Sequence, residues 1–377
     1  MTDQYNNVAL ADPRRALQIL PEREATRGER KRAVRTISLV FFALFAYEVI
    51  ANVTVGLVQY GVLWIFGKDT ASELFSNYYF LYGMQIFAMY LVGFPIFALI
   101  LRKLPKAKRY RANFSFGGMA AAVLILYGTT HLLSIVASNI EALIAELLSD
   151  YVRYPAGGSI LGTDVPIWLV IAVVVVIGPI VEELVFRKIL IDRVSVYGDR
   201  LAVAISAITF GLFHGNVTQL IYTTVGGIIF GYVYVKTRKI IYPIILHMVM
   251  NFLGSVPSLL LSKDAEEILE ILESGDTAKL IEMLPNYLVI FAYSLTTITL
   301  MIAGAVLIIA LLVKKKIVFS RCCDIRIKKR TVIHACFFTL GAILFYLAVD
   351  YSFASSFGLV ANYVTEIVNI ITKLIGG

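Results

Sequence analysis

The chain has 377 residues, of which 59% are hydrophobic and only 16% are charged, and its mean hydropathy is +0.79. Soluble domains carry about 25% charged residues, so this composition excludes a soluble enzyme. Each crossing of a membrane needs about 20 apolar residues, and the chain has enough for about eight or nine crossings. The sequence therefore predicts an all-α protein, a polytopic bundle of transmembrane helices.

The predicted elements begin with a basic N-terminal tail, residues 1–35, which lacks the apolar core of a cleaved signal peptide. Residues 36–353 are expected to form one transmembrane domain. The final segment, 354–377, is expected to be an interfacial helix or a further membrane segment. Apolar runs predict nine spans, at about residues 36–66, 75–101, 119–140, 165–190, 201–214, 217–235, 240–261, 284–313 and 331–353.

The formal net charge of +8 is explained by the loops. When the segments between spans are numbered alternately from a cytoplasmic N-terminus, the inside segments hold 29 of the 34 Lys and Arg residues. Such an excess in short cytoplasmic loops is the usual orientation signal of membrane proteins. We therefore expect a multi-pass protein of the plasma membrane with a cytoplasmic N-terminus. The lipid bilayer is an expected partner, and nucleic acid is not.

Ionisable side chains inside apolar spans cost about 2.5 to 3.5 kcal/mol at the bilayer centre and usually serve a function. Glu48, His131 and His334 stand apart from other such groups, and we expect a neighbouring helix or the interface to satisfy them. The remaining ones are concentrated in the predicted spans four, five and seven. They form the motifs EExxxR (Glu182, Glu183, Arg187), FxxxH (Phe210, His214) and HxxxN (His247, Asn251).

Helical spacing gives these residues provisional roles. Glu183 and Arg187 lie four residues apart and can form an ion pair, whereas Glu182 lies about 100° further round the helix and can point into a cavity. His247 and Asn251 have the same spacing, so both can direct hydrogen bonds at one point, as in an oxyanion hole. Two carboxylates of different pKa beside an arginine would suit the activation of water.

The motifs also lie at similar depths. At about 1.5 Å per residue from the basic flanks, Glu182 lies about 16 Å, His214 about 21 Å, and His247 and Asn251 about 12 to 18 Å into the membrane. The sequence therefore predicts that these side chains meet in one cavity. The alternative interpretation is a structural polar network that joins the helices.

The three motifs, in this order and each on its own apolar helix, resemble the CPBP family, also called the Abi or type II CAAX prenyl endopeptidase family of intramembrane proteases. The resemblance covers about residues 165–260, which we take as the motif core. It implies an eight-helix core around a conical cavity that is open to the cytosol and to lipid. The present chain would add about one C-terminal span to that core.

The resemblance also implies a role for each motif residue. Glu182 would be the general base that activates water, and His214 would help to bind and orient that water. His247 and Asn251 would stabilise the tetrahedral oxyanion. The two residues that would support the general base are Glu183 and Arg187.

Whether a metal takes part stays open at this point. Glu182, His214 and His247 could hold a catalytic zinc ion with water in the fourth position, as in a metalloprotease. Water polarised by Glu182 and His214 would suffice without a metal, and neither an aspartate nor a third histidine is available to orient a ligand. We therefore favour metal-independent chemistry and assign no cofactor.

The sequence thus predicts an intramembrane endopeptidase that hydrolyses peptide bonds of membrane-associated peptide or protein substrates, CAAX-like ones included, by glutamate-activated water. One alternative is a proton-coupled membrane transporter, in which the carboxylates and histidines form a relay. The other is a non-catalytic membrane scaffold or immunity protein. The compact chain without sorting signals is expected in a bacterial plasma membrane.

Overall fold

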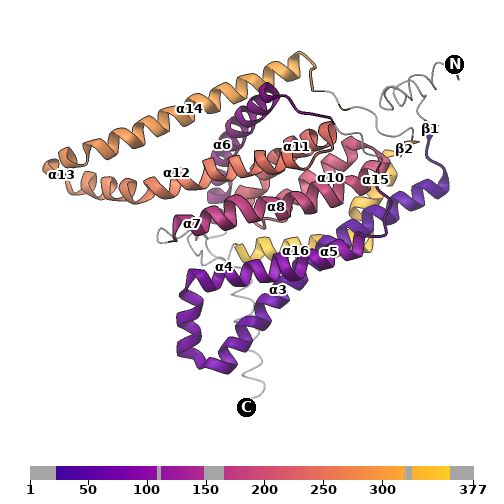
Figure 1. Cartoon of the computed structure of the whole chain (residues 1–377), viewed down its shortest axis with the longest axis horizontal. Helices are drawn as coiled ribbons and strands as arrows, with labels where there is room; N and C mark the ends of the chain where they lie inside the picture. Colours follow the sequence, from indigo (N-terminus) through magenta and orange to yellow (C-terminus); the bar gives the residue numbers. More distant parts are fainter. Residues whose placement is uncertain (1–22, 108–111, 148–164, 318, 320–324, 357–377) are drawn as a thin grey trace.

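The computed structural model describes residues 23–107, 112–147, 165–317, 319 and 325–356, and this part of the chain is almost wholly helical. Most of the long helices run side by side along the longest axis of the molecule (Figure 1). The predicted all-α class is therefore confirmed. In chain order the elements are β1 (Arg23–Glu24), α3 (Arg27–Ser76), α4 (Tyr78–Ile86), η1 (Phe87–Gly93), α5 (Phe94–Leu101), α6 (Phe116–Leu147), α7 (Ile167–Val170), η2 (Ile171–Ile177), α8 (Gly178–Glu183), η3 (Leu184–Ile191), α9 (Asp192–Val194), η4 (Ser195–Tyr197), α10 (Asp199–Leu212), α11 (Val217–Thr237), α12 (Ile241–Ser274), α13 (Thr277–Glu282), α14 (Leu284–Val313), β2 (Ile325–Arg326), α15 (Lys329–Phe337) and α16 (Leu340–Ser356).

Seven helical stretches among the described residues are long and apolar enough to cross a membrane, and the pair α15 and α16, bent by 53°, would make an eighth. The sequence predicted nine spans. The difference lies at 201–214, which forms the 14-residue helix α10. Such a helix covers only about 21 Å, less than the roughly 30 Å of a hydrocarbon core. It packs against α11 and η3 on one side, and Ile208 on the other side is 50% exposed.

The first helix is longer than the predicted span at both ends. It begins with a capping box, in which the Thr26 hydroxyl accepts from the backbone N–H of Glu29 and the Glu29 carboxylate accepts from the N–H of Thr26. Residues 27–35, which the sequence assigned to the N-terminal tail, therefore belong to this helix. A kink at Gly67, with φ of 77°, interrupts it near its far end. The segments 1–22 and 357–377 lie outside the described residues.

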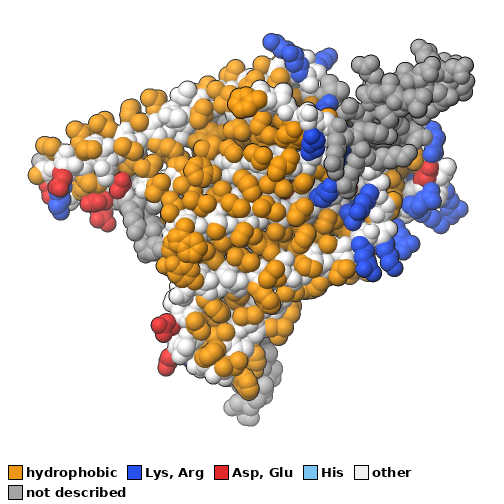
Figure 2. Space-filling model, viewed as in Figure 1, with side chains coloured by type: hydrophobic (Ala, Val, Ile, Leu, Met, Phe, Trp, Pro, Cys, Tyr) orange, Lys and Arg blue, Asp and Glu red, His pale blue; other side chains and the backbone are white. Residues whose placement is uncertain are grey.

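Charge separates along the long axis of the molecule. On the face seen in Figure 2, Lys and Arg side chains gather at one end and Asp and Glu side chains lie at the opposite extremities, with a hydrophobic surface between them. Positive charge is expected on the cytoplasmic side of a membrane protein. The pattern fits a multi-pass protein with one basic end, and the side on which the N-terminus lies stays a prediction.

Buried polar contacts at the basic end join helices that lead to the motif residues. The Arg193 Nε donates to the carbonyl oxygen of Leu101 at 2.7 Å, which joins α9 to the end of α5. The Tyr234 hydroxyl donates to Asp192 at 2.8 Å, and Arg238 pairs with Asp199. Buried charges are tolerated when they are paired and hydrogen-bonded. These contacts fix the ends of the helices around the motif core.

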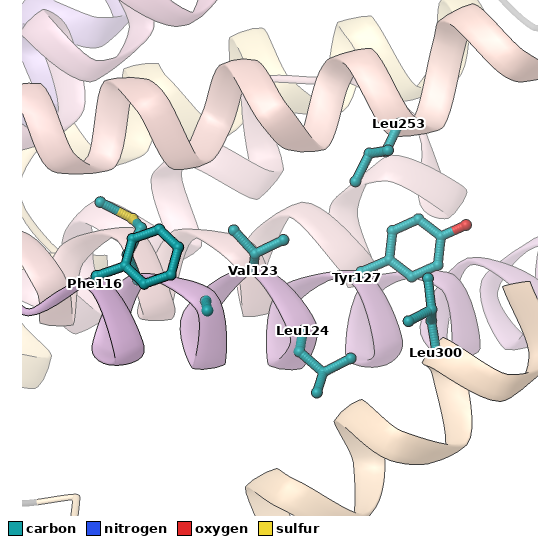
Figure 3. Close-up of a pocket in the computed structure, with 8 residues that line it drawn as sticks. Phe116, Val123, Leu124, Tyr127, Leu253 and Leu300 are labelled. Carbon is teal, nitrogen blue, oxygen red and sulfur yellow. The ribbon is translucent and has the colours of Figure 1, made fainter. Parts of the chain in front are cut away.

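Helix α14 is held against α6 by two glycines. A Cβ added to Gly128 would lie 2.8 Å from the Cα of Gly304, so the two backbones touch. The hydroxyls of Tyr127 and Thr297 add a hydrogen bond of 3.1 Å between the same helices. Beside this contact, α6, α12 and α14 line an apolar groove of 360 Å³ (Figure 3).

Replacing Gly128 by alanine should loosen this pair of helices, because the new methyl group would lie 2.8 Å from the Met301 carbonyl oxygen. We expect the free energy of unfolding to fall by about 1 to 3 kcal/mol, as for other overpacked sites. Thermal unfolding of the purified protein in detergent measures the change. Gly56→Ala in α3 is the matched control, since nothing lies within 4 Å of its added Cβ. Equal melting temperatures for the two variants would contradict this account.

Candidate active site

The two glutamates of the EExxxR motif end the short α-helix α8, and Arg187 lies in the π-helical segment η3 that follows; another π-helical segment, η2, precedes α8. Pro179 has no N–H to donate. In the i to i+5 register of η2 the carbonyl of Val174 would pair with that missing group, and it accepts instead from the Asn251 Nδ2 at 2.8 Å. Asn251 of the HxxxN motif therefore satisfies a backbone carbonyl that Pro179 leaves without its helical hydrogen bond, next to the EExxxR motif. Segments of π-helix are rare and are frequent at functional sites.

Glu183 is the buried carboxylate of the pair. Its side chain and that of Arg187 are both 0% exposed, and the Arg187 Nη1 lies 3.1 Å from the Glu183 Oε1. The same oxygen accepts from the His247 Nδ1 at 3.0 Å. Spacing predicted the ion pair, and the structure contains it. Spacing missed that Glu183 also orients His247, because that contact joins two helices 64 residues apart in the chain.

Glu182 occupies a different environment from its neighbour. Its side chain is 33% exposed, and its Oε2 lies 3.6 Å from the His247 Nε2. The imidazole thus stands between two carboxylates, with one ring nitrogen towards each. Because Nδ1 donates to Glu183, Nε2 is the ring nitrogen that faces Glu182. The helical phase predicted that the two glutamates would face different surroundings, and they do.

His214 lies in the turn that follows α10. Its Nδ1 donates to the carbonyl oxygen of Phe210 at 2.8 Å, so that Nε2 of the neutral ring is an acceptor. Glu182, His247 and Arg187 all lie within electrostatic range of this ring. The structure therefore brings the side chains of all three motifs to one place, at the convergence of η3, α10 and α12.

Phenylalanine rings surround the buried charges. The Arg187 guanidinium lies over the ring of Phe210 at 4.4 Å and over that of Phe230 at 5.2 Å. Phe230 also stacks on His247 at 4.9 Å, and Phe210 meets His214 edge-on at the same distance. Phe210 belongs to the FxxxH motif, whereas Phe230 belongs to no motif and the sequence did not predict its place in the site. The sequence feature that could have indicated its place is the glycine-rich α11, because glycines let helices pack closely; α11 approaches α10 at Gly227.

The isolated ionisable residues make contacts away from the three motifs, and Glu48 has the expected contact with a neighbouring helix. Glu48 accepts from the Ser352 hydroxyl of the neighbouring α16 at 2.5 Å. The His131 Nδ1 donates to the Tyr127 carbonyl of its own helix at 3.0 Å. His334 stacks on Phe338. None of these contacts involves a motif residue.

The donor set does not match a metal site. Within the described part of the chain, no group of three or more His, Cys, Asp or Glu side chains is arranged to hold a metal ion. The triad of Glu182, His214 and His247, which the sequence offered as possible zinc ligands, is therefore not arranged as a metal site either. The His247 Nδ1 faces Glu183 rather than an open position. We therefore derive no step through a metal ion.

Replacing Arg187 by methionine should leave the Glu183 carboxylate buried without its cation. Breaking a buried ion pair from one side costs about 3 to 5 kcal/mol, whereas removal of both charges is far milder. We therefore expect Arg187→Met to lower stability strongly and the double variant Glu183→Gln, Arg187→Met to recover much of it. Thermal unfolding in detergent measures both. Additive losses would show that the pair is not coupled.

Comparisons with known proteins agree with the motifs. Residues 164–253 match the family model described as type II CAAX prenyl endopeptidase Rce1-like. The chain is 26% identical over 208 residues to a protein of Bacillus subtilis (strain 168) named as the membrane peptidase YdiL, covering 52% of this chain and 80% of that protein. It is 32% identical over 99 residues to the membrane-embedded CAAX protease MroQ of Staphylococcus aureus (strain USA300), covering 24% of this chain and 39% of that protein.

No solved structure matches the chain significantly. The family model covers the segment that carries all three motifs. The resemblance inferred from those motifs is thereby confirmed: residues 164–253 of this multi-pass membrane protein are similar to the type II CAAX prenyl endopeptidase family.

Proposed function

We propose that the protein is a glutamate-dependent intramembrane endopeptidase that cleaves membrane-associated peptides or proteins. The comparisons support a protease of the CAAX type. The observation that carries the proposal is the contrast between two adjacent glutamates. Glu183 is fully buried with Arg187 and His247, while Glu182 is 33% exposed beside the same imidazole. An accessible carboxylate next to an oriented imidazole suits a general base.

In the proposed reaction, Glu182 removes a proton from water as the water oxygen attacks the carbonyl carbon of the scissile bond. His214 accepts a hydrogen bond from that water through Nε2, because its Nδ1 donates to Phe210. The carbonyl oxygen becomes an oxyanion in the tetrahedral intermediate. When the carbon–nitrogen bond breaks, the proton passes from Glu182 to the leaving nitrogen.

His247 is proposed to stabilise the oxyanion in its protonated form. Its Nδ1 donates to Glu183, which fixes the orientation of the ring. The Nε2 then donates to the oxyanion. Asn251 uses one amide N–H on the Val174 carbonyl and retains a second N–H for the same purpose. Arg187 and Glu183 support the site by fixing the ring of His247.

The organisation of the chain is proposed as the sequence predicted it. A transmembrane domain, 36–353, contains the motif core at 165–260, and the segments 1–35 and 354–377 flank it. The basic end seen in Figure 2 would face the cytoplasm. The relatives from Bacillus and Staphylococcus support a bacterial plasma membrane as the location. The proposed partners are the lipid bilayer and a membrane-associated substrate, which would enter the site from the bilayer.

Replacing Glu182 by glutamine should abolish cleavage, because the amide cannot take a proton from water. The protein should still fold, because the glutamine side chain has nearly the same size. The assay follows a prenylated CAAX peptide and its unlipidated counterpart in proteoliposomes. Glu73→Gln, at an exposed position of α3, is the control and should cleave normally. Full activity of Glu182→Gln would refute the mechanism. Proton-coupled uptake without cleavage by the wild type would favour a transporter, and a cellular phenotype that survives the substitution would favour a scaffold.

Removal of metal ions should leave the proposed reaction intact, since Glu182 and His214 act on water directly. We expect equal cleavage rates with and without a strong chelator. Elemental analysis of the purified protein accompanies the assay. Zinc in stoichiometric amount that is lost together with activity would overturn this part of the proposal.

A further inference from the structure

Tyr90 reaches the candidate site from a span that carries no motif. It lies on the π-helical segment η1, in the second span. A Cβ added to Gly178 would lie 3.3 Å from the Tyr90 Oη and 3.7 Å from the Glu182 Oε1. The two oxygens therefore face the same small volume, which Gly178 keeps open. This places a phenol hydroxyl beside the carboxylate that is proposed as the general base.

Tyr47, in the first span, supports this arrangement from behind. Its side chain is buried, and its ring packs on Phe213 at 5.2 Å, next to His214. The same ring fills the space beside Gly93, the last residue of η1, where a Cβ would collide with it. Tyr47 therefore fixes the segment that carries Tyr90.

Both phenol groups lie within electrostatic range of Glu182. Within the described part of the chain, the Tyr90 hydroxyl makes no hydrogen bond to another protein group. The side chain is only partly buried and lies beside the carboxylate proposed as the general base. The hydroxyl is therefore available to a reacting group.

The Tyr90 hydroxyl would add a hydrogen-bond donor to the oxyanion site proposed from the motifs. Asn251, one of its two assigned donors, has only one amide N–H left for the oxyanion, because the other is donated to the Val174 carbonyl. Oxyanion stabilisation depends on donors that are aimed in advance at the developing charge. A rigid tyrosine on a packed helix meets this requirement. The wide turns of η1 are also typical of functional positions in helices.

We propose that Tyr90 is a further catalytic residue, whose hydroxyl donates a hydrogen bond to the oxyanion of the tetrahedral intermediate. This inference rests on the proposed protease function. As water adds to the carbonyl carbon, the carbonyl oxygen gains the negative charge and Tyr90 stabilises it without transfer of its proton. The proton removed from water stays on Glu182 and then passes to the leaving nitrogen.

Tyr90→Phe tests the proposal, since it keeps the ring and removes only the hydroxyl. We expect kcat to fall about 100-fold, the usual effect of losing one oxyanion donor, with KM nearly unchanged. Tyr79→Phe, in the same span, is the matched control. Its ring stacks on Trp168 at 5.9 Å, and its activity should stay within about twofold of the wild type.

A second measurement separates catalysis from structure. A CAAX peptide with a phosphinate in place of the scissile amide mimics the tetrahedral intermediate. Its affinity for folded Tyr90→Phe should fall by the factor by which kcat/KM falls, while the KM of the substrate does not change. Unchanged kcat in Tyr90→Phe, or unchanged phosphinate affinity, would overturn the assignment of Tyr90.

The two proposals fail in different ways. If Glu182→Gln abolishes cleavage but Tyr90→Phe does not impair it, only the assignment of Tyr90 is wrong. If Glu182→Gln cleaves normally, the proposed function itself is wrong.

Discussion

The buried carboxylate of Glu183 is the interaction on which the site depends. One of its oxygens accepts from His247 and faces the guanidinium of Arg187, and all three groups lie inside an apolar bundle. A charge that is buried in this way costs several kcal/mol unless it is paired and well placed. The helices that carry the three residues must therefore keep their relative positions. The ring of His247 is oriented as a result, and Glu182 is left accessible beside it.

The surroundings of this pair come from apolar rings and from irregular backbone. Phe210 and Phe230 cover the guanidinium, which reaches no water-filled surface. Pro179 frees the Val174 carbonyl, and Asn251 satisfies it from another helix. Unsatisfied backbone groups are especially costly inside a membrane, so such a defect requires a partner. The hydrogen bond that Pro179 removes from its own helix is thus replaced by one from Asn251, and this bond aligns the EExxxR and HxxxN motifs.

Much of the fold follows from length and apolarity along the chain. The span at 284–313 has the bounds that the apolar run predicts, because a lipid-facing helix needs only a continuous apolar surface. The helix at Asp199–Leu212 was expected to span and does not reach the required length. Most of its apolar residues are buried by packing against α11 and η3. Hydropathy alone does not distinguish burial in protein from burial in lipid.

The sequence by itself determined the membrane class, the three motifs and the pairing of Glu183 with Arg187, because these depend on local spacing along a helix. Only the tertiary structure decided that Glu183 also orients His247, that Asn251 binds a backbone carbonyl and that Tyr90 faces Glu182. These contacts join residues on different helices. They depend on how the helices cross and on where π-helical turns shift the side chains, and neither is encoded in the periodicity of a single segment.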